Sequence, residues 1–174
     1  NKGDLVWENA YGGSGIDRSY SIVNTSDGGY AIAGQTLSSD ADVKKNNGES
    51  DIWLIKLDDT GQLVWEDSFG GTGFELAEGL SAMSDGGFMV VGNSKSSDGD
   101  TIENAGENDI WVIRTDSNGQ LEWQKSIGGS DLDYGFDILE NQDGSVMVVG
   151  ETLSQDFPDV QNKGFIDAVV IKLK

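Results

Sequence analysis

The sequence contains no cysteine and no histidine, and one of its 174 residues is proline. Without cysteine and histidine the chain has no disulfide framework, no thiolate nucleophile, no Ser-His-Asp triad, no zinc finger and no haem ligand set. Basic residues are also scarce, because 11 Lys and Arg stand against 31 Asp and Glu, which gives a net charge of −20. Such a surface repels nucleic-acid phosphates and anionic lipid headgroups, so we expect no nucleic-acid partner.

Long apolar runs are missing as well, and none approaches the roughly 20 residues of a membrane-spanning helix, so we expect no membrane insertion. The chain begins at Asn1 without a signal peptide or an initiator Met, from which we expect a processed chain or an excised segment. Hydrophobic residues make up 36% of the chain, which is enough for a core. The length predicts one domain over residues 1–174.

An internal repeat of 58 residues runs through the whole chain. Trp7, Trp65 and Trp123 keep this spacing, and four further sets keep it too. These sets are the Gly-Gly pairs at 12–13, 70–71 and 128–129, the Asp-Gly pairs at 27–28, 85–86 and 143–144, Gly34, Gly92 and Gly150, and Asp51, Asp109 and Asp167. Since three times 58 is 174, the repeats 1–58, 59–116 and 117–174 use every residue. Five sets with one period establish a three-unit repeat protein.

Each repeat carries the signals of short β-strands. In the first repeat the β-prone runs Ser19–Thr25 and Tyr30–Thr36 flank an Asp-Gly pair, which is the strongest short signal for a hairpin. Two more runs follow, Asp51–Leu57 and Gln62–Phe69. The other repeats place such runs at Gly87–Ser94, Asp109–Thr115, Gln120–Ile127, Ser145–Thr152 and Asp167–Leu173. No segment keeps a 3.6-residue apolar period between caps, so we expect few helices or none.

Four short antiparallel strands in each repeat are typical of a β-propeller blade. The runs at 30–33, 88–91 and 146–149 are continuously apolar, which indicates strands covered on both faces. We therefore predict an all-β fold, a propeller of four-stranded antiparallel blades. A β-helix is the competing interpretation.

The phase of the repeat predicts how such a propeller closes. Residues 3–11 match the fourth strands, and the sequence stops after a third strand, so the last blade lacks its outer strand. Three blades are too few for a ring, because known propellers have about four to eight. We expect a homodimer of three-blade halves, a six-bladed ring in which strand 3–11 of each chain completes the last blade of the other. A piece of a longer array is the alternative.

Two sets of repeated side chains have both a functional and a structural interpretation. The tryptophans, which include Trp53 and Trp111 with Val169 at the third position, form either a sugar-stacking platform or packing between blades. Packing is favoured, because the position accepts Val. The repeated acids are either catalytic or acceptors for backbone N–H groups of the glycine-rich loops, and the acceptor role is favoured. They are Asp51, Asp109 and Asp167, and Asp17, Glu75 and Asp133.

The long loops between the second and third strands hold the candidate metal ligands. These are Asp40, Asp42, Asp98, Asp100, Asp156 and Asp159. Oxygen ligands at alternating positions suit Ca²⁺, which takes about six to eight of them, although the spacing is not that of an EF-hand. Pro158 replaces the second acid in the third loop, so that site is altered or absent. The alternative is that the acids only keep the surface soluble.

The motif order of the third repeat resembles a known family. From Gly128 to Leu173 the chain reads Gly-Gly-Ser, Asp-Gly, Val-Val-Gly, Asp-Phe-Pro and Asp-Ala-Val-Val-Ile-Lys-Leu. This order resembles the bacterial β-propeller repeats called SBBP and is similar to the delta-60 type repeats of large secreted and cell-surface proteins. The resemblance implies a secreted or cell-surface location in bacteria and a scaffold or adhesive role. It carries over no catalytic residues.

From these features we expect a non-catalytic extracellular module for interaction or adhesion, which binds a glycan, a protein or a surface and takes Ca²⁺ as its candidate ion. Distinctive residues recur in every repeat, whereas an active site is usually a single asymmetric constellation. A structural spacer or filament-forming repeat is the first alternative. A carboxylate-based polysaccharide hydrolase or lyase is the second, because two of the 31 acids would suffice for that chemistry.

Overall fold

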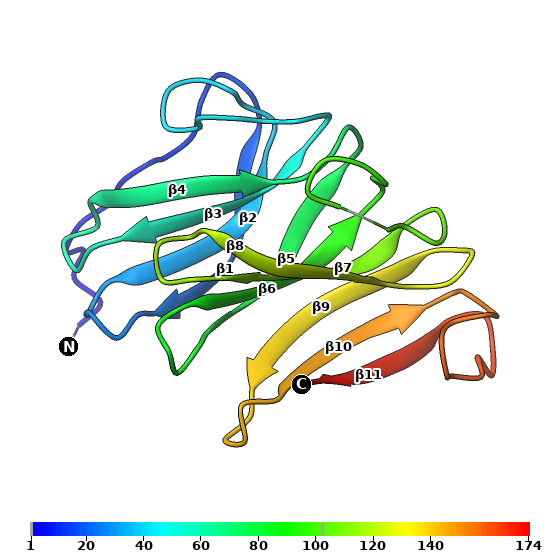
Figure 1. Cartoon of the computed structure of the whole chain (residues 1–174). Coiled ribbons are helices and arrows are strands. Elements are labelled where there is room, and N and C mark those ends of the chain that lie inside the picture. Colours follow the sequence, from blue (N-terminus) through cyan, green and yellow to red (C-terminus); the bar gives the residue numbers. More distant parts are fainter. Residues whose placement is uncertain (1, 102) are drawn as a thin grey trace.

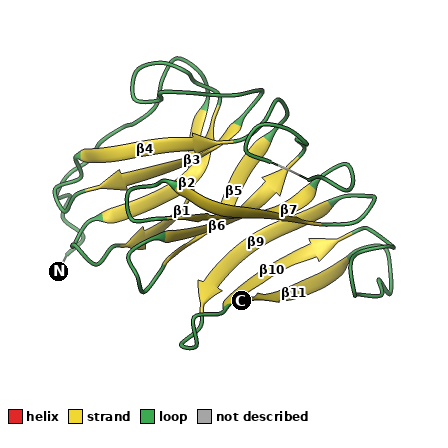
Figure 2. Ribbon diagram, in the orientation of Figure 1, coloured by secondary structure: helices red, strands yellow, loops and turns green. Residues whose placement is uncertain are grey.

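A computed structural model describes residues 2–101 and 103–174 and contains eleven β-strands in three antiparallel sheets. The described residues include no helix, and hence none that could cross a membrane (Figure 2). The prediction of an all-β fold is therefore confirmed. Nine of these strands begin and end within two residues of a predicted run, because the Asp-Gly hairpins and the apolar runs define them locally. The other two, Glu75–Ala82 and Asp133–Glu140, had no predicted run of their own.

Each sheet is a simple meander of consecutive strands (Figure 1). The first sheet contains β1 (Asp17–Asn24), β2 (Tyr30–Thr36), β3 (Asp51–Leu57) and β4 (Leu63–Phe69). The second contains β5 (Glu75–Ala82), β6 (Phe88–Ser94), β7 (Asp109–Thr115) and β8 (Leu121–Ile127). The third contains β9 (Asp133–Glu140), β10 (Val146–Thr152) and β11 (Asp167–Leu173), so among the described residues β11 has a neighbour on one side only.

The three sheets stack face to face, and the first strand of each later sheet packs on the sheet before it. β5 contacts the first three strands of the first sheet, and β9 contacts the first three strands of the second. The middle sheet is apolar on both faces: Phe88 and Val90 pack towards the first sheet, while Met89 and Val91 pack towards the third. This double coverage explains why β6 and β7 contain continuous apolar runs and not alternations.

A glycine near the end of each second strand allows one strand to pass very close to another. The register of β5 and β6 shifts between Ala77 and Gly79, and Gly92 faces this bulge. A Cβ at Gly92 would collide with the backbone oxygen of Leu76, and Gly34 and Gly150 are equally crowded. A bulge and a close backbone approach, the two usual reasons for a glycine within a strand, are therefore both present at this position.

The tryptophans of the third strands are packing residues. Trp53 is 3% exposed and Trp111 is fully buried. Their indole N–H groups donate to Glu66 Oε2 (2.9 Å) and Gln124 Oε1 (2.7 Å). Buried indoles with satisfied N–H groups contribute to the core and offer no face for sugar stacking.

Residues 3–11, predicted as a strand, do not form one within this chain. A strand needs a neighbouring strand with free backbone groups, and β11, the predicted neighbour, lies in the third sheet at the opposite end of the stack (Figure 1). The prediction that this segment completes another chain's sheet concerns a partner and stays a prediction.

Replacing Gly92 with Ala should destabilise the protein strongly, because the new methyl group would overlap the backbone of β5. We expect a loss of about 2–4 kcal/mol in the free energy of unfolding, measured by urea denaturation. Gly164→Ala is the matched control, because a Cβ there meets its nearest atom, Asp167 Oδ1, at 3.9 Å. Equal stability of the two variants would contradict the close-approach interpretation.

Candidate functional site

The predicted metal ligands and the Gly-Gly loops form one hydrogen-bonded arrangement that repeats along the chain. In the second repeat, four successive backbone N–H groups each donate to a side chain. The pairs are Gly70 N with Asp100 Oδ2 (3.2 Å), Gly71 N with Glu75 Oε2 (2.9 Å), Thr72 N with Asp98 Oδ1 (2.8 Å) and Gly73 N with Ser96 Oγ (2.8 Å). We call this set of four bonds, and its copies, the cap network. It ties the long loop to the turn between two sheets.

The first repeat has the same network with the same sequence offsets. Its pairs are Gly12 N with Asp42 Oδ2 (3.1 Å), Gly13 N with Asp17 Oδ2 (2.8 Å), Ser14 N with Asp40 Oδ1 (2.7 Å) and Gly15 N with Ser38 Oγ (2.8 Å). Asp17 and Glu75 are therefore acceptors for backbone N–H groups, as their position beside the glycines suggests.

The third repeat keeps three of the four bonds. They join Gly129 N to Asp133 Oδ2 (2.7 Å), Ser130 N to Asp156 Oδ1 (2.8 Å) and Asp131 N to Ser154 Oγ (2.9 Å). Pro158 stands where the other networks have Asp42 and Asp100, and it has no side-chain acceptor to offer. Asp159 lies on an exposed stretch with a left-handed backbone, φ +57°.

Five of the six predicted calcium ligands thus bind backbone N–H groups. The bonds from the Ser130 N–H and hydroxyl hold the pKa of Asp156 below its ordinary value. Among the described residues, no three His, Cys, Asp or Glu side chains gather closely enough to hold a metal ion. The calcium site therefore stays a prediction, and the observed chemistry of these acids is capping.

Sequence reasoning missed that the loop acids and the Gly-Gly loops are partners. In all three repeats, the residue that follows the Gly-Gly pair donates its N–H to an Asp 26 residues later in the chain, as Ser14 does to Asp40 and Thr72 does to Asp98. That constant offset was visible in the repeat, but an offset alone does not reveal a contact.

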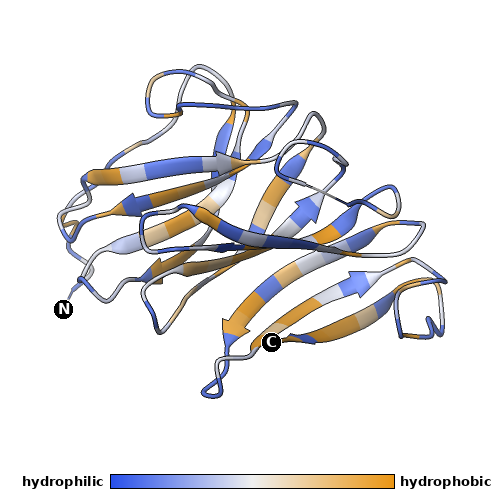
Figure 3. Cartoon of the chain, in the orientation of Figure 1, coloured by the Kyte–Doolittle hydropathy of each residue, from blue (hydrophilic) through white to orange (hydrophobic). Residues whose placement is uncertain are grey.

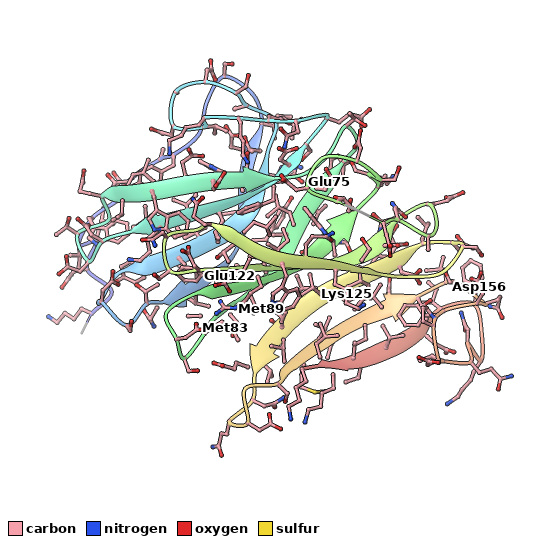
Figure 4. All side chains as sticks on the ribbon, in the orientation of Figure 1. Glu75, Met83, Met89, Glu122, Lys125 and Asp156 are labelled. Atoms are coloured by element: carbon pink, nitrogen blue, oxygen red, sulfur yellow. The ribbon has the colours of Figure 1, made fainter. Side chains whose placement is uncertain are left out.

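A second set of acids is buried where one sheet meets the next. Asp51, at the start of β3, and Glu75, at the start of β5, are both fully buried, and their strands are joined by the bond from Glu75 N to Ser50 O (2.7 Å). Figure 4 labels Glu75 at this junction. Asp109 and Asp133 form the equivalent pair between the second and third sheets.

Each of these pairs includes at least one carboxylate oxygen that accepts no hydrogen bond from the described residues. Among the described residues, Asp51 Oδ1, Asp109 Oδ1 and Asp133 Oδ1 are buried without a hydrogen-bond partner. Burial raises the pKa of Asp51 to about 6; the Asn47 N–H opposes the shift, Glu75 and Asp100 add to it, and Lys45 reduces it. Burial also raises the pKa of Asp109, with a further contribution from Asp133. An ionised carboxylate that is buried without full hydrogen bonding is costly, so Asp51 and Asp109 weaken the folded chain at neutral pH.

Comparisons with known proteins add one weak similarity. No family model matches the chain. Among curated proteins, it is similar to the regulatory protein FlaEY of Caulobacter vibrioides, with 27% identity over 145 residues. The match covers 79% of this chain and 15% of FlaEY, so the chain spans a small part of that protein.

Replacing Asp98 with Ala removes the acceptor for both the N–H and the hydroxyl of Thr72. We expect the melting temperature to fall by roughly 2–4 °C, as for the loss of about 1 kcal/mol in a chain of this size. Asp59→Ala removes the same charge from an exposed turn and is the control. Adding Ca²⁺ before the scan tests the predicted site: an ion held by Asp98 would raise the melting temperature of the parent chain and leave that of the Ala variant unchanged.

The buried acids should make the protein more stable in mild acid. The folded-state pKa of Asp51, about 6, exceeds its ordinary value of 3.8, so the folded state binds more protons and gains stability as the pH falls from 7.5 towards 5. Asp51→Asn should flatten this slope and raise the stability at pH 7.5 by about 1–3 kcal/mol. Denaturant midpoints between pH 5 and 8 measure both effects, with Asp59→Asn as the charge control. A parent chain whose stability falls steadily as the pH is lowered from 8 to 5 would contradict the assignment.

Proposed function

We propose that this chain is a non-catalytic extracellular scaffold built as part of a β-propeller, whose three sheets are blades and whose end faces bind further copies or other proteins. The proposal rests on apolar side chains that are exposed at the two ends of the stack of sheets. Because the repeats are related by 58 residues, each exposed side chain can be compared with its own equivalents in the other sheets.

The outer face of the third sheet is apolar and open to solvent. We call Val149, Ala168 and Val170 the C-terminal end face. Val170 is 65% exposed, whereas its equivalents Leu54 and Val112 are fully buried against the following sheet. Val149 is likewise exposed, and Figure 3 shows the apolar residues that run along β10 and β11. This face has the composition of a sheet interface and lacks the covering sheet.

The outer face of the first sheet is its counterpart. We call Tyr20, Ile22 and Ile32 the N-terminal end face. Ile22 is 60% exposed, while its equivalents Leu80 and Ile138 are each 4% exposed. Since the same positions pack the second sheet on the first and the third on the second, the two end faces are complementary in kind. A second copy can therefore place its first sheet on the third sheet of this one.

The acids support a scaffold and not an enzyme. Glu75, Asp109 and Asp133 are at most 1% exposed, so no polysaccharide can reach them. The loop acids hold backbone N–H groups, and every such arrangement occurs in at least two copies. A catalytic pair needs both access and a single asymmetric setting.

The resemblance to SBBP-type repeats supports a secreted or cell-surface location. The net charge of −20 supports a partner that is neither nucleic acid nor an anionic membrane. A glycan or protein ligand at the loops, and Ca²⁺ as a stabilising ion, belong to the same proposal.

Light scattering coupled to size-exclusion chromatography tests the role of the end faces. We expect a particle of twice 18.6 kDa, the homodimer of three-blade halves. Val170→Asp places a charge in the C-terminal end face and should shift the particle to a monomer. Val64→Asp is the control, because Val64 is 57% exposed on β4 and the equivalent position holds Glu122. A parent chain that is monomeric at high concentration would overturn the proposal.

A further inference from the structure

Residues 3–11 already lie where the outer strand of a preceding sheet would lie. Trp7 meets Tyr30 edge-on, with ring centroids 6.0 Å apart and an interplanar angle of 61°. Trp65, in β4, meets Phe88 of the next sheet at 5.8 Å and 65°. Since Trp7 and Trp65 are repeat equivalents, and Tyr30 and Phe88 are too, the segment sits against the first sheet as β4 sits against the second.

The glycine that begins the segment also has the conformation of a hairpin-turn glycine. Gly3 has φ +73°, close to the values of the turn glycines Gly61 (+79°) and Gly119 (+81°). Asn9 fixes the segment further, because its Nδ2 donates to Gly61 O (2.9 Å), and the Tyr11 hydroxyl donates to the same oxygen. The segment is therefore held in place before it has any strand partner, which reduces the entropy lost on pairing.

The third sheet has a vacant place that matches this segment. Trp7 lies against the turn glycine Gly61, and Trp65 lies against Gly119. Their equivalent Trp123 is 41% exposed, and among the described residues no turn glycine of the third sheet lies against it. A groove of about 670 Å³ lies there, between β8 and the end of β11, and its apolar lining includes Met83, Met89, Trp123 and Leu173. Figure 4 labels Met83, Met89 and Lys125 around it.

The charges of the groove and of the segment are complementary. Although the chain has a net charge of −20, the groove is not acidic: Arg114 is ion-paired with Asp85, which leaves Lys125 and Lys174 against Glu140 in its lining. Residues 3–11 contain two acids, Asp4 and Glu8, and no basic residue. An acidic segment is therefore attracted to this groove, whereas most of the surface would repel it.

We propose that residues 3–11 of a second copy of this chain form the fourth strand of the third sheet, paired with β11, with Gly3 of that copy against Trp123. The inference rests on the proposed end-face assembly and specifies its register. In the complete sheets Leu54 pairs with Asp67 and Lys56 with Trp65. The 58-residue repeat converts these pairs into Val170 with Asn9 and Lys172 with Trp7 of the second copy.

Disulfide trapping tests this register without interference, because the chain has no cysteine of its own. The variants Asn9→Cys and Val170→Cys are mixed and oxidised, and non-reducing electrophoresis measures cross-linking. We expect most of the mixture to form a heterodimer, because directly opposed residues of paired strands lie about 4.5–5.5 Å apart between Cα atoms, within disulfide range. The matched control replaces Asn9→Cys with Ala10→Cys, whose side chain points to the other face of the strand.

The outcomes separate the docking of the strand from the assembly itself. Selective cross-linking through position 9 supports the docking, and a chain that carries both cysteines should then give covalent dimers or longer ladders. A particle of twice 18.6 kDa with no cross-link, or with equal cross-linking through positions 9 and 10, overturns the strand docking and leaves end-face assembly standing. A monomer without cross-links overturns both.

Discussion

Coverage of apolar sheet faces is the constraint on which the rest of this structure depends. A strand that is apolar on both sides loses the hydrophobic stabilisation of one side whenever that side meets water, about 25 cal/mol for each Å² left exposed. The middle sheet satisfies the constraint, since Val90 and Val91 point to opposite faces and are both fully buried. The outer sheets satisfy it in part: Trp53, Ile55 and Leu57 are buried on the outer face of the first sheet, but Ile22 there is exposed. Val170 on the third sheet is exposed as well, and these two side chains are the basis of the end-face proposal.

The repeat gives the three sheets similar apolar faces, and it also gives the loops between them similar cap networks. Each cap network supplies acceptors to a glycine-rich loop whose N–H groups have no strand to bind, four acceptors in the first two repeats and three in the third. Carboxylates are good acceptors for this task because their bonds to N–H groups are charge-assisted. Part of the acidic composition is thus explained by backbone chemistry and not by a ligand. Pro158 shows that one acceptor can be lost while the others, at Asp133 and Asp156, still bind the loop.

The sequence predicted the parts of this fold that depend on local or periodic signals. Asp-Gly pairs located the hairpins, and the 58-residue period located corresponding strands, because both signals lie within a few residues of the structure they form. The contacts of Asp98 with Thr72 could not be predicted, since they depend on how a long loop folds back over another segment. For the same reason the sequence suggested cation binding by the loop acids but not their hydrogen bonds to backbone N–H groups. The strand at 3–11 was predicted from its likeness to β4, but likeness does not supply a neighbour within the chain.

The acids of this chain divide into two groups with opposite effects on stability. Hydrogen bonds from Ser145 lower the pKa of Asp143, in a hairpin turn, to about 2, so this acid favours the folded state at any pH well above its ordinary value. Burial raises the pKa of Asp51 at the sheet junction, so that acid favours the folded state only as the pH falls below about 6. Between pH 3.8, the ordinary pKa, and about pH 6, lowering the pH reduces the cost at Asp51, while Asp143 stays ionised and keeps its contribution. Of these two acids, the one at the junction between sheets, and not the one in the exposed turn, is therefore where neutral pH weakens the stack.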